Sequence, residues 1–470
     1  MSAKFGATSK RKDCIIHNNF KYVKHRQNKN GTVIWRCSKY ISFHCKARLT
    51  TRGRDVIKVQ QPEHTHTGNG EAARAVTALD EMKTKMGDIG ATPSSSQASV
   101  AAGLSDDVLM ALPKKASLAR TLRRHRQKVA ERDNGGVALP PLPTDPFFEI
   151  PEMFKLMLLH DSTMGNNRVL ILGNEVLLDG LGRAEVWIAD GTFSVVPSIF
   201  FQLYSIHFEF GSGINPAAVY CLLNNKTQES YNAMISAVKN LVPAANPKKI
   251  LVDFEKSAMT AFSTNYPAAT VTGCYFHLTQ SILRKVQEVG MKVAYEQDDA
   301  LRISVRCLAA LAFVPVCDVA DAFDLLIESM PAHDHMNELL SYFEHTYIRG
   351  RRLRGRAEAY GSALFPPPLW NQHEASISGI ARTTNIAEGW HHGLQHLFQC
   401  HHPTMWTFLT GIQRDINTQK SLLLQGAAGV AHQPRKKYRL LQERVENAVS
   451  AYGRTEILVY LKAIAHLSHS

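Results

Sequence analysis

The sequence VWIADGTF at residues 186–193 places an aspartate, Asp190, at the end of a short apolar run. ILVDFEKS at residues 250–257 repeats the pattern, with Asp253 directly after three aliphatic residues. Short runs that are rich in β-branched and aromatic residues are typical of buried strands. We therefore expect two buried strands, each of which ends in or directly precedes one of the aspartates.

A third acidic residue, Glu388, lies far downstream in RTTNIAEGW at residues 382–390. Its surroundings have helical periodicity, since apolar residues recur on one face at Ile386, Trp390, Leu394 and Leu397. Three carboxylates brought close together repel one another. Divalent cations about 3.5–4 Å apart offset that repulsion and hold the attacking and leaving oxygens of a phosphodiester. The pattern favours a catalytic site in which two Mg²⁺ or Mn²⁺ ions are held by Asp190, Asp253 and Glu388.

Each acid also has a structural interpretation. Asp-Gly between apolar runs is a strong hairpin signal, and Asp190 is followed by glycine. Asp253 is placed to cap a helix that begins at Phe254, and Glu388 to be the partner of an Asn385 cap. Taken singly, the acids leave these alternatives open.

The sequence blocks around the three acids decide between the catalytic and the structural interpretations. DGTFSVVPSIFFQLYSIHF (190–208), LVDFEKSAMTAF (251–262), CYFHLTQS (274–281) and RTTNIAEGWHHGL (382–394) follow one another in the chain. Together they resemble the successive blocks of the MULE transposase domain of Mutator-like DNA transposons, over residues 155–415. The resemblance implies a ribonuclease H-like core with a DDE triad, which maps onto Asp190, Asp253 and Glu388. In that family Thr-Asn-Asn usually precedes the glutamate, whereas this chain has Thr-Thr-Asn.

The resemblance also implies a C-x-x-H motif, which maps onto Cys274 and His277. The two residues are one helical turn apart, so both can face one site. They are candidates for a second metal site with Cys400 and His402. The alternative is a buried cysteine that packs, beside a histidine that forms hydrogen bonds.

Further accessory residues lie around the glutamate. His391 and His392 follow it by three and four residues and are within reach of the metal site or of the substrate. Arg382 is a candidate phosphate contact. We expect these to contribute less than the triad.

The net charge of +13 is unevenly distributed. Residues 1–68 carry a net charge of +12, residues 114–132 carry +7, and the remainder carries −6. Clustering of this kind is the electrostatic footprint of a nucleic-acid-binding protein. No lipidation motif or aromatic-faced amphipathic helix favours a membrane surface instead. We expect double-stranded DNA as the partner and no small-molecule cofactor.

The N-terminal segment contains the ligand set of a structural zinc ion. Cys37, Cys45, His64 and His66 form the pattern C-x7-C-x18-H-x-H. In a strand, residues i and i+2 point to the same side, so we expect the two histidines to converge from a strand. A module of about 60 residues buries little apolar surface, which makes a zinc ion a useful addition to its stability. The alternative is two free cysteines and two loop histidines.

Residues 14–66 resemble the FLYWCH-type zinc finger, which implies a small antiparallel sheet that holds Zn²⁺ through two Cys and two His and contacts DNA or protein. Basic residues recur throughout the module and again in the helical segment ASLARTLRRHRQKVAER (116–132). Such side chains position a protein on phosphates without reading sequence. The DNA-binding candidates are Lys21, Lys24, Arg26, Arg36, Lys39, Lys46, Arg48, Arg52, Arg54, Arg123, Arg124 and Arg126.

We therefore expect an α+β multidomain protein with four parts. Residues 1–68 form the FLYWCH-type module, and the Ala-, Ser- and Gly-rich residues 69–143 a flexible linker with a basic helix at 114–132. Residues 144–420 form the MULE ribonuclease H-like catalytic core, with a helical insertion at about 285–380. Residues 421–470 form a C-terminal helical tail, for which self-association and packing onto the core are both open.

A run of arginines from Arg349 to Arg356 is a candidate for contact with the DNA backbone, with a solvated loop as the alternative. This run, Lys10–Lys12 and residues 120–128 are each suited to nuclear import. No apolar signal-peptide region or membrane-spanning run is present, and eight cysteines favour a reducing compartment over a disulfide framework. We expect a nuclear protein.

Two functions fit these features. The first is a Mutator-like transposase that binds DNA through the zinc finger and hydrolyses and transfers phosphodiesters at the DDE site. The second is a domesticated transposase that regulates DNA or chromatin without catalysis. The DNA target, the oligomeric state and the role of the Cys274 and His277 pair are not encoded in any pattern.

Overall fold

A computed structural model describes residues 4–7, 13–53, 55–60, 63–211, 213–352, 360–378, 385–430 and 436–467. Arg54, Arg382, Lys10–Lys12, Arg354 and Arg356 lie outside these residues. The chain divides into two units, Met1–Pro141 and Leu142–Ser470. None of the described helices is long and apolar enough to cross a bilayer.

The first unit begins with an antiparallel sheet whose six strands pair in sequence order. The strands are β1 (Lys4–Ala7), β2 (Asp13–His17), β3 (Phe20–Gln27), β4 (Thr32–Cys37), β5 (Arg48–Arg52) and β6 (Asp55–Gln60). One face of the sheet packs around Trp35, whose Nε1 donates to Thr51 Oγ1 at 3.0 Å. This core includes Ile15, Tyr22 and Leu49, together with Cys37 and Cys45.

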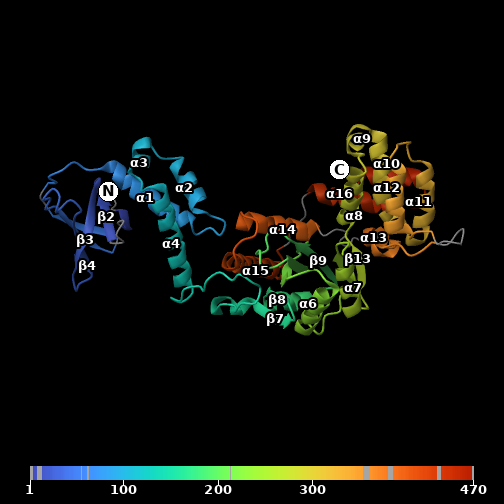
Figure 1. Ribbon diagram of the computed structural model, residues 1–470, viewed down its shortest axis with the longest axis horizontal. Helices are drawn as coiled ribbons and strands as arrows, with labels where there is room; N and C mark the ends of the chain where they lie inside the picture. Colours follow the sequence, from blue (N-terminus) through green and yellow to red (C-terminus); the bar gives the residue numbers. More distant parts are fainter. Residues whose placement is uncertain are drawn as a thin grey trace. The chain divides into compact units, whose positions relative to one another are not determined.

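Four helices follow the sheet, where the sequence predicts a flexible linker. They are α1 (Gly70–Lys85), α2 (Pro93–Ala101), α3 (Asp106–Ala111) and α4 (Lys115–Asp133). Polar residues that appear linker-like act as caps: Asn69 accepts from the backbone of α1, and Thr92 and Ser95 form a capping box on α2. The helices share a core of Ala78, Met82, Met86, Val100, Leu118 and Leu122. Helix α1 also contacts β1 and β3 (Figure 1).

The second unit is built on a mixed sheet of seven strands in the order β13-β12-β9-β10-β11-β8-β7. The strands are β7 (Leu158–Met164), β8 (Asn167–Gly173), β9 (Val186–Thr192), β10 (Gln202–Phe208), β11 (Ala217–Leu223), β12 (Lys249–Val252) and β13 (Thr270–Gly273). Strands β9, β12 and β13 run parallel to one another, and the remaining neighbours are antiparallel. Their C-terminal ends therefore lie at one edge of the sheet.

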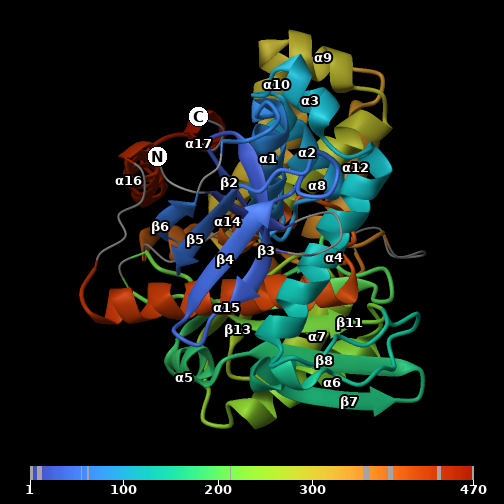
Figure 2. The ribbon, with the colours of Figure 1, turned by 90° about the vertical axis from the view of Figure 1, so that its left-hand side faces the viewer.

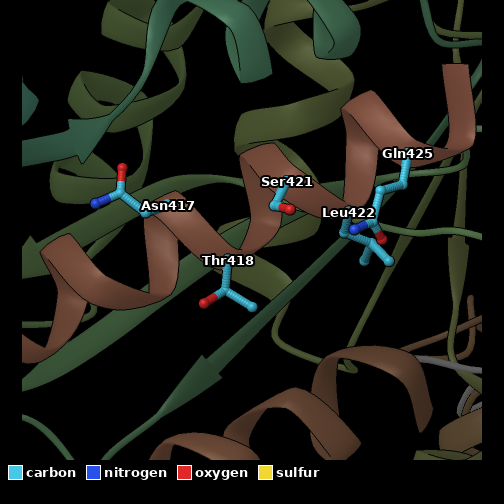
Figure 3. A pocket seen from close by; sticks show the side chains of 5 residues that line it. All are labelled: Asn417, Thr418, Ser421, Leu422 and Gln425. Carbon is cyan, nitrogen blue, oxygen red and sulfur yellow. The ribbon is translucent and has the colours of Figure 1, made fainter. Parts of the chain in front are cut away.

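Helices cover both faces of this sheet, as Figures 1 and 2 show. On one face α14 (Asn385–Phe398) contacts β9, and α15 (Met405–Ala427) contacts β11. On the other, α6 (Gln228–Leu241) and α7 (Lys256–Asn265) pack through the ring pairs Tyr204–Tyr231 and Trp187–Tyr266. The short elements α5 (Glu175–Arg183) and η1 (Glu152–Met157) complete this part.

A helical group stands beside the sheet, in the segment where the sequence predicts an insertion (Figure 1). Its elements are α8 (Tyr275–Glu288), α9 (Lys292–Gln297), α10 (Asp299–Ala310), η2 (Leu311–Phe313), η3 (Val316–Asp318), α11 (Val319–Glu328), α12 (Met336–Phe343), η4 (Glu344–Ile348), η5 (Pro367–Leu369) and α13 (His373–Ile377). The C-terminal helices α16 (Lys436–Ser450) and α17 (Ile457–Leu467) pack onto this group, and Tyr460 Oη donates to Phe313 O at 2.6 Å. The tail thus adopts the packed arrangement left open by the sequence.

Candidate metal centres and nucleic-acid interface

One aspartate lies within a strand, and the other directly follows the neighbouring parallel strand. Asp190 lies inside β9 and pairs with Ser205 of β10, so the Asp-Gly pair is not a hairpin turn. Strand β12 ends at Val252, directly before Asp253. Leu251 is in register with Ile188, and continuing that register places Asp253 beside Asp190. Helix α7 begins at Lys256 with Glu255 as its cap, so Asp253 does not cap it.

Helix α14 brings Glu388 to the same face of the sheet. Ala387 packs against Ile188 and Leu251, the residues two positions before the aspartates. Since side chains alternate along a strand, these aspartates point to the face that α14 covers. One ligand atom each of Asp190, His277 and Glu388 lie within 4.8 Å of one another. Asp253 is not part of that group, although its charge acts on Asp190.

The loop that carries Asp253 is anchored by the next residue. Phe254 makes edge contacts with Tyr347 and Phe365, at centroid separations of 5.6 and 5.1 Å. Its ring lies so close to Gly273 that a Cβ there would come within 2.4 Å of it. Gly273 ends β13, directly before Cys274 and α8, so this contact joins the segments after β12 and β13.

Burial dominates the electrostatics of the cluster, and the nearby positive charge of Lys226 offsets only part of its effect on Asp253. Burial, reinforced by the charges of Asp253 and Glu388, raises the pKa of Asp190 well above its usual range, although the Gly191 N–H opposes the shift. Burial and the nearby Glu255 charge raise the pKa of Asp253 to about 7. Burial also raises the pKa of Glu388. A site of this kind favours protons or cations.

A histidine network lies behind Asp190. His391 Nδ1 is 3.5 Å from Asp190 Oδ2, and its Nε2 is 3.5 Å from Ser205 Oγ. Ser205 Oγ lies 3.1 Å from His207 Nε2 and donates to Asp190 O at 3.3 Å. Burial lowers the pKa of His391 to about 3 and that of His207 to about 4, so both imidazoles are neutral. Ser205 and His207 were not found from the sequence, because within an apolar strand they carry no signal of their own.

Helix α14 is fixed by a second, partly buried group of side chains. Trp390 Nε1 and Tyr220 Oη both donate to Asp415 Oδ2, at 2.8 and 2.6 Å. The Trp390 ring also contacts His207 at a centroid separation of 4.9 Å. These contacts hold the helix that carries Glu388 and His391 against the sheet.

The other accessory candidates do not come together in one site. Cys274 is buried at the start of α8, whereas Cys400 is exposed, and the described residues hold no ligand group that joins Cys274, His277, Cys400 and His402. His402 instead contacts Val196 O through Nδ1 at 3.0 Å. His392 is exposed. Arg349, expected at the DNA backbone, is paired with Asp324 and Glu344, while Arg351 and Arg352 are exposed.

The zinc ligands of the first unit lie together. Ligand atoms of Cys37, Cys45, His64 and His66 are within 4.8 Å of one another. Cys37 Sγ is 3.1 Å from His66 Nε2, and Cys45 Sγ is 3.3 Å from His64 Nδ1. Residues 63–66 form no strand, and the chain bends at Thr65 and His66, so the expected strand geometry of H-x-H is wrong. The backbone turns both rings inward instead.

Neighbouring groups orient both imidazoles. Tyr22 Oη is 2.8 Å from His64 Nε2, and His66 Nδ1 is 2.9 Å from Thr67 O. The Phe20 ring stacks on His64 with an interplanar angle of 2°. Partners on the second nitrogen are typical of metal-binding histidines, because they fix the tautomer and the ring direction. Burial lowers the pKa of His64 to about 4, which keeps it in the neutral form that a metal requires.

Strand register divides the basic residues of the first unit. Tyr22 pairs with Cys37 and Trp35 with Leu49, which defines the zinc face of the sheet. Side chains alternate along each strand, so the residues between these point to the opposite face of the sheet. They include the set that we name the basic sheet face: Arg26, Arg36, Arg48, Arg52 and Lys58. Arg26, Arg52 and Lys58 are exposed, and Arg36 and Arg48 are half-buried.

Four other candidates lie elsewhere in the first unit. Lys24 pairs with Trp35 on the zinc face, and Lys39 and Lys46 lie in the segment between β4 and β5; all three are exposed. Lys21 is half-buried beside Cys14, at the part of the sheet where α1 packs.

In α4 the three arginine candidates differ. Arg123 and Arg124 are exposed. Arg126 is half-buried and donates to the backbone carbonyls of Met86, Asp88 and Ala91. Its guanidinium therefore holds the segment between α1 and α2.

Family models match both parts of the architecture. The FLYWCH zinc finger domain matches residues 5–66, which include all four zinc ligands. The MULE transposase domain matches residues 186–281, which include Asp190, Asp253, Cys274 and His277. The chain combines a FLYWCH zinc finger with a MULE transposase domain. No curated protein matches the chain.

These matches support zinc binding and a transposase-related, DNA-binding protein. The MULE match ends before Glu388, so the place of Glu388 beside Asp190 comes from the fold alone. The α+β class predicted from the sequence is confirmed, with an antiparallel zinc finger followed by a mixed sheet with many helices.

Proposed function

We propose that this protein is a DNA transposase of Mutator-like type. The FLYWCH finger holds zinc and binds double-stranded DNA, and the second unit is a ribonuclease H-like core that hydrolyses and transfers phosphodiesters. Three antiparallel strands, β9, β10 and β11, followed by β12 and β13 in parallel beside β9, support that assignment. A nuclear location fits a DNA-binding protein of this composition.

The acid cluster fits divalent cations. Buried Asp253 Oδ1, Glu388 Oε1 and His277 Nδ1 have no hydrogen-bond partner among the described residues. Buried polar atoms are normally paired, and unpaired ones mark a place where an ion or water belongs. Carboxylate oxygens are the ligands that Mg²⁺ and Mn²⁺ prefer. Asp190, Asp253 and Glu388 would hold the ions, which supply charge neutralisation and activation of water or of a DNA 3′-hydroxyl.

The chain's own residues then have three tasks. The strand ends and α14 bring the carboxylates together before DNA arrives, so little reorganisation is needed at the moment of reaction. His391, held by Ser205, fixes the direction of the Asp190 carboxylate. The basic sheet face and the exposed Arg123 and Arg124 contact phosphates and so position the duplex.

One observation carries this proposal. Asp190 on a strand and Glu388 on a helix are nearly 200 residues apart in the sequence, yet a carboxylate oxygen of one lies within 4.8 Å of a carboxylate oxygen of the other. The test of the proposal is a nicking and strand-transfer assay on supercoiled and short duplex DNA with Mn²⁺. We expect cleavage by the native protein and loss of at least 100-fold in Asp190→Asn, with DNA binding unchanged. Cleavage that survives in Asp190→Asn would contradict the triad.

A second candidate is a domesticated DNA-binding regulator. It is favoured by one observation: the zinc finger and its basic sheet face belong to a different unit from the acids, so DNA binding does not need the acid site. Tight DNA binding without cleavage, by both the native protein and Asp190→Asn, would favour this second function over a transposase.

A further inference from the structure

His277 is the one member of the acid site to which the proposed two-metal chemistry gives no role. It lies in the first turn of α8, directly after β13, the third of the parallel strands. Its Nε2 is 3.5 Å from Glu388 Oε1. The side chain is about three-quarters buried, with 25% of its surface exposed. An imidazole has therefore been placed among carboxylates at the C-terminal edge of the sheet.

The spacing of this group is close to that of a coordination sphere. Two atoms bound to one cation at about 2.0–2.2 Å are at most about 4.4 Å apart. The ligand atoms of Asp190, His277 and Glu388 all lie within 4.8 Å of one another. Small rotations of the side chains are enough to close such a group on an ion.

We propose that His277 is a ligand of one of the two cations, together with Asp190 and Glu388. Asp253, which is outside this group, then remains beside Asp190 for the other cation. The proposal rests on the proposed function, since it assigns a further ligand to the same site. It also makes a statement about the ion. Mg²⁺ prefers oxygen ligands and water, whereas imidazole favours first-row transition ions. One of the two positions is therefore selective for ions such as Mn²⁺ over Mg²⁺.

The experiment uses the full-length, zinc-loaded protein and Mn²⁺ as the probe, added at one equivalent or less. Free Mn²⁺ is measured from its electron paramagnetic resonance signal, which gives an affinity. Electron spin-echo modulation from ¹⁴N then reports whether an imidazole is bound directly. The proteins are the native chain, His277→Gln, Asp190→Asn and, as a matched control, His392→Gln, whose exposed imidazole is on α14 and outside the ligand group.

We expect ¹⁴N modulation in the native protein and in His392→Gln, and none in His277→Gln. The Mn²⁺ affinity of His277→Gln should fall by roughly tenfold or more, with a smaller change for Mg²⁺ measured by competition. Loss of a merely structural contact would not remove the ¹⁴N signal while Mn²⁺ stays bound. An unchanged thermal unfolding midpoint shows that the variant is folded.

The outcomes separate the two proposals. If the native protein binds Mn²⁺ without ¹⁴N modulation, or if the modulation persists in His277→Gln, then His277 is not a ligand. If Asp190→Asn loses Mn²⁺ in that same case, the acid site stands and only the role of His277 is overturned. If Asp190→Asn and His277→Gln both bind Mn²⁺ like the native protein, the acid cluster is not a metal site, and the proposed function falls with it.

Discussion

Glu388 Oε1 and His277 Nε2 lie 3.5 Å apart, although one residue comes from α14 and the other from the first turn of α8. This contact shows how the second unit assembles its acid site. Asp190 lies near the end of β9, Asp253 follows β12, and His277 lies in the helix that follows β13, so all three lie at the same edge of the sheet. Glu388 comes from a helix far downstream in the chain. Sites at the carboxyl ends of parallel strands follow from the fold itself, because those ends share one edge.

The first prediction concerns the zinc ligands. Cys45→Ser should release the zinc ion and unfold the sheet of the first unit, since structural zinc supplies on the order of 10 kcal/mol to small modules. Metal content and DNA affinity measure the effect, and both should be lost. The matched control is His44→Asn, at an exposed neighbour with a positive φ of 49°, which asparagine tolerates. If Cys45→Ser retains a full equivalent of zinc, the ligand set is different.

The second prediction concerns the basic sheet face. Replacing its three exposed members (Arg26, Arg52 and Lys58) by alanine should weaken DNA binding at all sequences. Each phosphate contact contributes about 0.9 to the slope of log K against log salt, so the slope should fall by roughly 2–3. Fluorescence anisotropy over a salt series measures it.

The control for that experiment removes the same amount of charge elsewhere. Lys24, Lys39 and Lys46 are exposed but lie outside the basic sheet face. Their triple alanine variant should change the slope by less than 1. An equal loss in both triples would show that the charge of the whole module, and not one face, binds DNA.

The third prediction concerns pH and the metal-free acid site. The pKa of Asp253 is raised by burial to about 7, from an ordinary value of 3.8. The folded state thus binds the proton more tightly than the unfolded state does. The stabilisation from this proton is fully present below the unfolded pKa and is lost as the pH rises through the folded pKa. The free energy of unfolding should therefore fall between about pH 4 and pH 7, by on the order of 3 kcal/mol from this residue.

Asp253→Asn tests this effect. In the presence of a chelator, the native protein should lose this stabilisation as the pH rises, whereas the variant has none to lose. The unfolding free energy of the variant minus that of the native protein should therefore increase over that pH range. Titrations of the zinc finger cancel, because both proteins contain it. Added Mg²⁺ or Mn²⁺ should reverse the difference at pH 7, since the variant lacks the carboxylate that binds one of the two ions. A difference that is flat with pH would mean that burial does not raise the pKa of Asp253.

Local pattern was sufficient for some features and not for others. The strands that carry Asp190 and Asp253 were predicted because apolar runs report their own burial. The zinc ligand set was predicted from residue type, yet His64 and His66 do not lie in the expected strand. The contacts that orient the His64 ring come instead from Tyr22 and Phe20 of β3, more than 40 residues earlier in the chain. Long-range partners of this kind leave no local trace.

The same limit applies to the segment predicted as a linker and to the network behind Asp190. An Ala- and Ser-rich composition does not distinguish a tether from short helices that bury methionines such as Met82 and Met86 in a shared core. Ser205 and His207 have meaning only beside His391, which is nearly 190 residues away. Distant contacts of this type are set by the tertiary fold, which local periodicity does not describe.

The last prediction separates structural from DNA-binding arginines in α4. Arg126 donates to the carbonyls of Met86, Asp88 and Ala91, and burial lowers its pKa. Arg126→Ala leaves these carbonyls without their donor, which should cost about 1–3 kcal/mol of stability in the first unit. The matched variant is Arg124→Ala, which removes an exposed arginine from the same helix. It should leave stability unchanged and lower the salt slope of DNA binding by about 1. Chemical unfolding and anisotropy on both variants measure the two effects. If Arg126→Ala lowers the salt slope without loss of stability, then Arg126 contacts DNA, and the hydrogen bonds that it makes to the segment between α1 and α2 contribute little.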